Sequence, residues 1–249
     1  MDRARQWTNS GRFVVGPRLK SILLFGGTFD PVHNGHTTMA IGALAESGAS
    51  QLTILPAGNP YQRGRLPIAT SRQRVAMVEI AFAEVANVAI DTRELDRSGP
   101  TYTLDTLREL RQVHGDDASL VWLIGGDAFA RIDTWHEWQS LFTFANFAVA
   151  VRQEEPHPMH IASAALKAYL ASRQTNARAL GTSPCGSYAM LQVSVPPVSS
   201  TDIRARVMSH QSIRGLAPDG VCDYIEQHKI YEPEEKIQVG YQKTDDDRH

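Results

Sequence analysis

The fold of this chain is decided by the stretch Ile22-Leu23-Leu24-Phe25-Gly26-Gly27-Thr28-Phe29-Asp30-Pro31-Val32-His33-Asn34-Gly35-His36. A short apolar run of strand length leads into a polar, glycine-containing turn, and helix-forming residues follow at 39–44. The pattern therefore predicts a strand, a tight loop and a helix. Junctions of this kind bind phosphate in α/β proteins, because the first helical turn has unpaired N–H groups and the positive end of the helix dipole.

The residues of the turn suit a polyphosphate. Gly26 and Gly27 lack a Cβ, which lets a ligand approach the backbone amides closely. His33 and His36 add two side-chain donors at the same place. The chain contains neither a G-x-x-x-x-G-K-[ST] loop nor a G-x-G-x-x-G fingerprint. Two alternatives stay open for the histidines, zinc ligation and simple surface positions. No third ligand stands nearby at a metal-site spacing, so no protein metal site is expected.

At this point a family is recognisable. Residues 26–36 resemble the first signature of the HxGH nucleotidyltransferase superfamily, in the form found in bacterial nicotinate-nucleotide adenylyltransferases. The segment Ser199-Ser200-Thr201-Asp202-Ile203-Arg204 is similar, residue for residue, to the second signature of that superfamily. A Ser/Thr cluster that opens a helix, with an Arg one turn later, is itself an anion cradle. Taken apart from the family resemblance, the same segment is typical of a helix N-cap beside a surface arginine. The resemblance extends over about residues 21–231.

The resemblance implies an ATP site built from both signatures. His33, His36 and Arg204 would be the catalytic residues, because they would hold the triphosphate and the transferred phosphoryl group. The implied ATP-binding residues are Gly26, Gly27, Thr28, Phe29, His33, His36, Ser199, Ser200, Thr201 and Arg204. Mg²⁺ is the implied cofactor, held mainly by the ATP phosphates, consistent with the absence of a carboxylate cluster.

Three segments would bind the base and phosphate of a mononucleotide. In the loop 57–65, Arg63 would contact the phosphate, although Gln62 and Arg63 stand where the family commonly has His and Lys. Thr103 would lie at the nicotinate carboxylate, and Trp135 would stack on the pyridine ring. The plainer interpretations are a solvated loop charge for Arg63, the N-cap of a helix reaching Gly115 for Thr103, and core packing for a Trp135/Trp138 pair on one helix.

Two further segments end strands and face the same crevice. Gly125 and Asp127 follow the apolar run 119–124, where a carboxylate can accept hydrogen bonds from ribose hydroxyls. The alternative for Asp127 is that it merely starts a helix. Arg152 follows the run 146–151 and is expected to touch the nucleotide.

Composition narrows the class of protein. The 249 residues are 42% hydrophobic and carry a formal net charge of −2, which argues against a broad nucleic-acid or membrane surface. Two cysteines cannot form a disulfide framework, and no apolar run has the length of a membrane span. We expect a cytoplasmic enzyme with one domain at 21–231, a poorly ordered extension at 1–20 and a charged, disordered tail at 232–249. The sequence does not indicate an oligomeric state.

The alternation of strands and helices predicts an α/β fold, a Rossmann-like three-layer α/β/α sandwich with a mostly parallel sheet. Expected strands include 51–56, 88–90 and 188–195, and expected helices include 161–172 and 220–228. The implied reaction is adenylyl transfer from ATP to nicotinate mononucleotide, giving deamido-NAD and pyrophosphate in NAD biosynthesis. Alternatives are another acceptor, nicotinamide mononucleotide or phosphopantetheine, and a non-catalytic module that senses adenylates.

Overall fold

The strand and helix at the quoted stretch are present in the computed structural model, as β3 (Ser21–Gly27) and α1 (Asn34–Ser47). The structure describes residues 5–7, 13–15, 20–59, 66–151 and 156–233, with the first two segments described by their backbone alone. Arg5–Trp7 (β1) and Phe13–Val15 (β2) pair antiparallel in a separate two-stranded sheet. The proposed division into extension, domain and tail stays a prediction.

The central sheet has six strands in the order β5-β4-β3-β6-β7-β8, and every neighbouring pair is parallel. Besides β3, its strands are β4 (Gln51–Pro56), β5 (Val88–Ile90), β6 (Ser119–Gly125), β7 (Asn146–Ala150) and β8 (Tyr188–Leu191). Along the chain, β4 and then β5 add to one side of β3, and the next strand, β6, pairs with the opposite side of β3. Ligands bind outside the carboxyl ends of parallel strands at such a reversal of order, here between β3 and β6.

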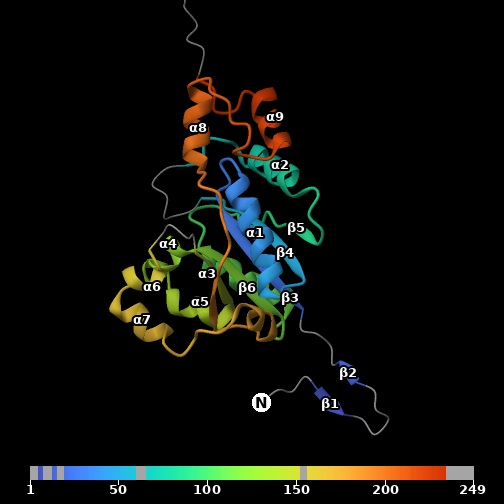
Figure 1. The fold of residues 1–249 in the computed structure, drawn as a ribbon, viewed down its shortest axis with the longest axis vertical. Coiled ribbons are helices and arrows are strands. Elements are labelled where there is room, and N and C mark those ends of the chain that lie inside the picture. The colour runs from blue at the N-terminus through green and yellow to red at the C-terminus, as the bar shows by residue number, and fades with distance from the viewer. Residues whose placement is uncertain (1–4, 8–12, 16–19, 60–65, 152–155, 234–249) are drawn as a thin grey trace, which may run out of the picture.

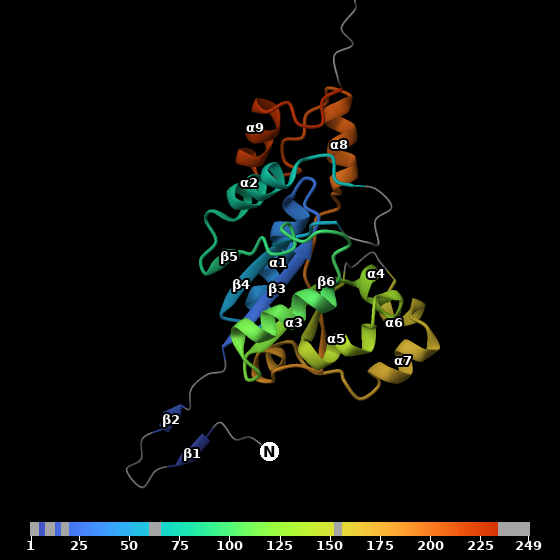
Figure 2. The same cartoon turned by 180° about the vertical axis from the view of Figure 1, so that it is seen from behind.

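Helices cover both faces of the sheet (Figures 1 and 2). One face carries α1 and α2 (Ser71–Phe82), while α8 (Ser200–Met208) and α9 (Asp219–Gln227) extend the same core at the end of the molecule near α2. The other face carries α3 (Thr103–His114), α4 (Gly126–Phe129), α5 (Trp138–Phe144), α6 (Pro158–Ile161) and α7 (Ala164–Leu170). Two 3₁₀ helices, η1 (Ile132–Thr134) and η2 (Ala177–Thr182), complete the connections.

Alternation along β3 explains why two cores form. Leu23 and Phe25 belong to the core under α1 and α2, whereas Ile22 and Leu24 belong to the core under α3 and α5. Successive side chains of a strand point to opposite faces, so a strand that is buried on both faces is apolar throughout. The predicted Rossmann-like sandwich is confirmed.

Several predicted boundaries are wrong. The strand predicted over 188–195 ends at Leu191, because its partner β7 ends at Ala150, which pairs with Leu191. The helix predicted over 161–172 is shorter: α7 spans 164–170, and residue 161 ends the separate short helix α6. Ser163 caps α7, with its hydroxyl accepting a hydrogen bond from the Leu166 N–H at 3.1 Å. In the part of the chain that the structure describes, no helix combines the length and apolar character needed to cross a membrane.

Candidate functional site

The two histidines of the first signature form the N-terminus of α1. His33 is the N-cap, and its Nδ1 accepts a hydrogen bond from the His36 N–H at 3.3 Å. The Nδ1 of His36 accepts from the His33 N–H at the same distance. Because a ring nitrogen that accepts carries no proton, each neutral ring has its hydrogen on Nε2. The rings stack with their centroids 3.6 Å apart, so two Nε2–H donors lie together at a helix N-terminus.

The glycines of this loop are required by aromatic side chains of the protein itself. A Cβ on Gly26 would lie 2.7 Å from the Trp122 ring, and one on Gly27 would lie 2.8 Å from the Phe29 ring. A side chain at either position would therefore collide with the protein's own aromatic rings, whereas close approach of a ligand to the amides of Gly26 and Gly27, which line the cavity described below, stays a prediction. Phe29 adopts a left-handed backbone with φ of 50°, and its ring meets His36 edge-on at 5.1 Å. Phe29 thereby supports the histidine that the loop presents.

The second signature contacts the first directly. Ser199 caps α8 by accepting from the Asp202 N–H, and Ser200 donates from its hydroxyl to the Pro31 carbonyl at 2.9 Å. Arg204 donates to the Asp30 carbonyl at 2.6 Å and to the Thr201 hydroxyl at 3.2 Å. The N-cap interpretation holds for Ser199, whereas the surface interpretation of Arg204 is wrong, because only 9% of that residue is exposed.

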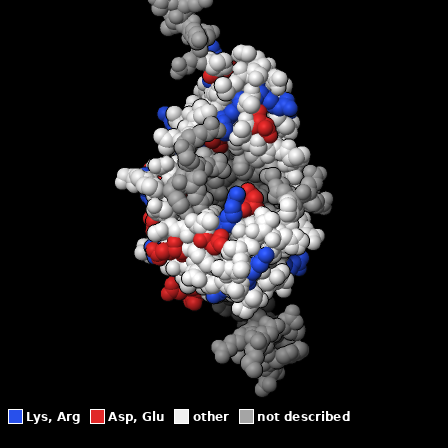
Figure 3. All heavy atoms as spheres, turned by 90° about the vertical axis from the view of Figure 1, so that its left-hand side faces the viewer, with Lys and Arg blue, Asp and Glu red and all other residues white. Residues whose placement is uncertain are grey.

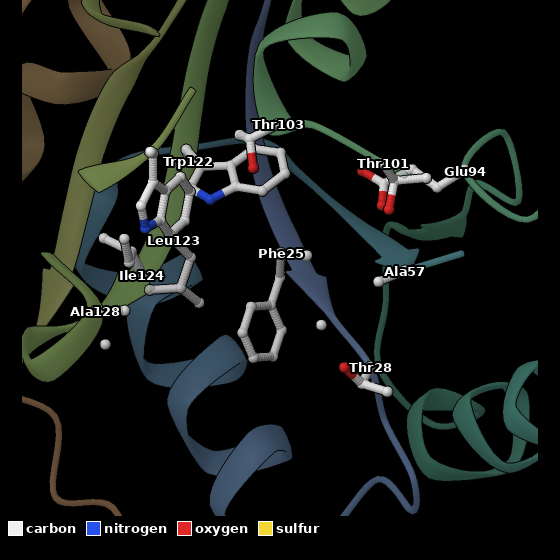
Figure 4. A pocket seen from close by; sticks show the side chains of 14 residues that line it. Phe25, Thr28, Ala57, Glu94, Thr101, Thr103, Trp122, Leu123, Ile124 and Ala128 are labelled. Carbon is white, nitrogen blue, oxygen red and sulfur yellow. The ribbon is translucent and has the colours of Figure 1, made fainter. Parts of the chain in front are cut away.

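A cavity of about 230 Å³ opens at the carboxyl ends of β3 and β6 (Figure 4). Six predicted site residues line it, namely Gly26, Gly27, Thr28, Thr103, Gly125 and Trp135. Figure 3 shows a hollow in this side of the molecule, with acidic and basic side chains beside it. The structure thus brings residues from both sides of the β3/β6 reversal into one cavity.

Thr103 and Trp135 reach this cavity from different elements. Thr103 is the first residue of α3 and points its hydroxyl into the cavity beside Trp122 (Figure 4). Its predicted role as N-cap is wrong, because Tyr102 occupies that position. Trp135 follows η1 and is half-buried against the core beneath α3. Trp138 instead begins α5 and packs edge-on against Tyr169 at 4.8 Å, so the two tryptophans do not share one helix.

Asp127 does not line the cavity itself but lies against Gly125, which does. It belongs to the first turn of the short helix α4 and is exposed, as its alternative interpretation requires. A Cβ on Gly125 would lie 2.9 Å from Asp127 Oδ1, so this carboxylate covers Gly125, which lines the cavity. Arg63 and Arg152, like Gln62, lie outside the described residues.

Sequence reasoning missed several residues beside the predicted site. Glu94 and Thr101 line the cavity together with Trp122, and Glu94 accepts from the Thr106 hydroxyl at 2.7 Å. Burial raises the pKa of the Glu94 carboxyl. Neither Glu94 nor Thr101 stands in an apolar pattern or a strand end, so no local signal marks either residue as part of a site.

Arg74 was also missed. This fully buried arginine of α2 donates to the Thr28 carbonyl at 2.7 Å and to the Ala57 carbonyl at 2.8 Å, and burial lowers its pKa. The only sequence signal is that Arg74 shares a helical face with the buried Met77 and Val78, at spacings of three and four residues.

The described residues contain no group of three or more His, Cys, Asp or Glu side chains placed to hold a metal ion. The side chains of the two signatures that were predicted to bind phosphate are imidazole, hydroxyl and guanidinium groups. Magnesium prefers oxygen ligands, mainly carboxylates, phosphates and water. This donor set fits a Mg²⁺ ion that arrives bound to the phosphates of its nucleotide.

Comparison with known proteins gives one consistent family. The cytidylyltransferase-like family model matches residues 24–206. A protein of Dechloromonas aromatica, named probable nicotinate-nucleotide adenylyltransferase, is 40% identical over 213 residues, which is 84% of this chain and 96% of the relative. A protein of the same name from Chromobacterium violaceum is 39% identical over 84% of this chain and 97% of its own length.

Solved structures show the same fold. The Plasmodium falciparum nicotinic acid mononucleotide adenylyltransferase complexed with NaAD aligns with a TM-score of 0.63 at 18% identity, covering 85% of this chain and 97% of that one. The described fold, the contact between the two signatures and the similarity over 84% of this chain agree. The chain belongs to the cytidylyltransferase-like family, and within it to the nicotinate-nucleotide adenylyltransferases.

Proposed function

We propose that this protein transfers the adenylyl group of ATP to nicotinate mononucleotide, giving deamido-NAD and pyrophosphate in NAD biosynthesis. One observation carries the proposal. The two signatures contact each other in the loop after β3, and the cavity that begins at Gly26, Gly27 and Thr28 of the first signature extends to Thr103 and Trp135 on the β6 side. A triphosphate and a mononucleotide can therefore bind side by side with their phosphates adjacent.

The reaction needs positioning and charge stabilisation more than proton transfer. A phosphate oxygen of the mononucleotide attacks the α-phosphorus of ATP, a new P–O bond forms, and the bond to the β-phosphate breaks with pyrophosphate leaving. That nucleophile is already anionic, so no general base is required. The Nε2–H groups of His33 and His36 and the first amides of α1 would stabilise charge on the triphosphate.

The second signature would hold the departing pyrophosphate. A guanidinium has five N–H donors, and Arg204 uses two of its nitrogens on Asp30 and Thr201. In this proposal its remaining donors, the Thr201 hydroxyl and the backbone N–H groups at the start of α8 bind the β- and γ-phosphates, because the hydroxyls of Ser199 and Ser200 already donate to Asp202 and Pro31. Mg²⁺, where bound by the phosphates, would offset their negative charge; no carboxylate of the site is needed to hold it.

The acceptor would bind at the opposite end of the cavity. Thr103 and the amides of the first turn of α3 suit the nicotinate carboxylate, and Trp135 suits stacking on the pyridine ring. Gly125 and Asp127 would bind the ribose. The role proposed for Arg63 at the phosphate rests on the sequence of its loop and on the family resemblance, and the role proposed for Arg152 at the nucleotide rests on its place after the run 146–151 in the sequence. A cytoplasmic location remains part of the proposal.

Turnover with different acceptors tests this function. We expect purified full-length protein with ATP and Mg²⁺ to release pyrophosphate when nicotinate mononucleotide is added. We expect the release to be at least about tenfold slower with nicotinamide mononucleotide, because amides that bind a carboxylate are left poorly satisfied by a carboxamide. ATP binding without pyrophosphate release would support the sensor instead. Faster turnover with the amide or with phosphopantetheine would reassign the acceptor.

A pair of tryptophan variants tests the acceptor end in the same assay. Trp135→Ala is expected to raise the KM for the mononucleotide about fivefold to tenfold while the KM for ATP changes less than about twofold, because one ring stack is lost. Trp138→Ala is the matched control, since this ring is also half-buried but packs on Tyr169 away from the cavity. Equal effects of Trp135→Ala on both substrates would exclude the stacking role.

A further inference from the structure

A tyrosine near the end of the described chain is hydrogen-bonded to the first signature. The Tyr231 hydroxyl donates to Oδ1 of Asp30 at 2.8 Å across a sequence separation of 201 residues. Each residue is only 6% exposed. Burial and the neighbouring Asp30 carboxylate raise the pKa of the tyrosine, so the hydroxyl keeps its proton and acts as the donor.

The backbone at both ends of this hydrogen bond is strained. Lys229 and Tyr231 have φ of 49° and 71°, and Phe29, next to Asp30, has φ of 50°. Non-glycine residues adopt this left-handed region at a cost and persist in it where their surroundings fix them. The bend after α9 places Tyr231 in the core, and Figure 1 shows α9 at the same end of the molecule as α2 and α8.

Asp30 is contacted by three other segments of the chain. Its carboxylate accepts from the backbone N–H groups of Ile68 and Ala69 at 2.9 Å and 3.0 Å. The Arg204 guanidinium lies 3.8 Å from the same carboxylate and donates to the Asp30 carbonyl. Asp30 therefore joins the loop after β3, the segment before α2, the second signature and the chain after α9.

The position of Asp30 affects how the two histidines are held. Phe29 precedes Asp30 and meets the His36 ring edge-on, while His36 stacks on His33. Any shift of the Asp30 backbone moves Phe29, and with it the surface against which His36 rests. Groups that act on a phosphoryl transfer must be held closely, because a displacement of about 1 Å can cost a large factor in rate.

We propose that Tyr231 is a positioning residue for the triphosphate half of the site, acting through Asp30 on Phe29 and His36. The kinetic part of this inference rests on the proposed function. Tyr231 itself does not line the cavity, and its hydroxyl donates to Asp30 inside the core. Its loss should therefore disturb nucleotide binding at the histidines and leave the mononucleotide end unchanged.

The variant Tyr231→Phe removes the hydroxyl and keeps the ring. We expect it to weaken binding of α,β-methylene-ATP about fivefold by calorimetry and to lower kcat/KM for ATP about tenfold, with the KM for nicotinate mononucleotide within about twofold. The matched control is Tyr188→Phe, which removes another buried tyrosine hydroxyl, bonded to Gln174 at 3.4 Å on the other side of the sheet. Tyr188→Phe should leave both nucleotide measurements unchanged.

A double-mutant cycle decides whether Tyr231 acts through Asp30. If it does, Tyr231→Phe adds little to the loss of ATP-analogue affinity caused by Asp30→Asn, whereas independent effects would add. A lower melting temperature of Tyr231→Phe with unchanged ATP-analogue affinity and unchanged kcat/KM would overturn the proposal in favour of a purely structural role. Absence of pyrophosphate release by the wild type would instead reject the proposed function, and the analogue affinities would still test the positioning role.

Discussion

The Glu94 carboxyl is buried beside the cavity, and this makes the stability of the protein depend on pH. Burial raises its pKa in the folded protein above the ordinary value of 4.5, with Asp91 and Glu109 raising it further and the Thr106 hydrogen bond and Arg97 opposing the shift. Between the two pKa values the folded state holds a proton that the unfolded chain lacks. Stability must therefore fall as pH rises through that window.

The variant Glu94→Gln should remove this fall in stability with rising pH. The glutamine amide does not titrate, and its oxygen can still accept the hydrogen bond from Thr106. The measurement is the melting temperature of both proteins from about pH 4, below the ordinary pKa, to about pH 8, over which the wild type should decline relative to the variant. Glu79→Gln, on the exposed face of α2, is the control and should follow the wild type. A constant difference between wild type and Glu94→Gln across this range would contradict the inferred shift.

Residues inside a short motif were predictable from sequence, and residues defined by burial were not. His33 and His36 stand three apart before a helix, so their presence at its N-terminus follows from local spacing. Glu94 and Arg74 are buried only because distant segments cover them. The reason for Gly26 was also beyond local inference, because Trp122 comes from a strand far along the chain.

At the scale of elements, one side chain of α2, that of Arg74, forms hydrogen bonds with two loops beside the cavity. Arg74 donates from a single nitrogen to the carbonyls of Thr28 and Ala57, at the ends of β3 and β4. Replacing it by methionine keeps a long unbranched side chain but leaves both carbonyls without this donor. We expect Arg74→Met to lower the free energy of unfolding by about 2–4 kcal/mol, the cost of buried polar groups losing their partner.

Denaturant titration measures this cost. Arg72→Met, an exposed position of the same helix, is the matched control and should change stability by less than about 0.5 kcal/mol. Desolvation lowers the pKa of Arg74, so part of the loss from removing its contacts is offset by no longer burying a cation. A neutral or stabilising Arg74→Met would mean that this offset dominates and that the two loops hold their positions without the arginine.

The existence of the elements was easier to predict than their ends. β3, β4 and β6 are buried on both faces and therefore mostly apolar, which makes them recognisable in the sequence. The end of β8 depends on where β7 stops, which is a pairing and not a local property. The start of α3 was misplaced by one residue, since a threonine has strong N-cap preference but Tyr102 holds the position.

At the scale of the whole molecule, alternation along the chain predicted parallel layers but not how the two signatures meet. Their proximity was implied by the family resemblance. In the structure, hydrogen bonds from Ser200 to Pro31 and from Arg204 to Asp30 hold the two signatures together. The strand order matters for the same reason, because β3 and β6 are neighbours only after the chain reverses. Arg63 and Arg152 remain predictions.

Truncation tests whether the domain predicted at 21–231 is sufficient. Both cores and every predicted site residue lie between 20 and 233. We expect a chain of residues 20–233 to keep the melting temperature and turnover of the full chain. A chain ending at residue 228 loses Ile230 and Tyr231, whose side chains are buried in the core beneath α2, and should be less stable by about 3–5 kcal/mol.

The two truncations together separate packing from positioning. The chain ending at 228 should also show the weakened ATP-analogue binding of Tyr231→Phe, since it lacks the hydroxyl that holds Asp30. If the 20–233 chain loses turnover while its melting temperature is unchanged, the residues outside it contribute to catalysis and the domain limits are wrong. If the chain ending at 228 keeps full ATP-analogue affinity, the first signature holds its shape without Tyr231, because its contacts with Arg74 and α8 suffice.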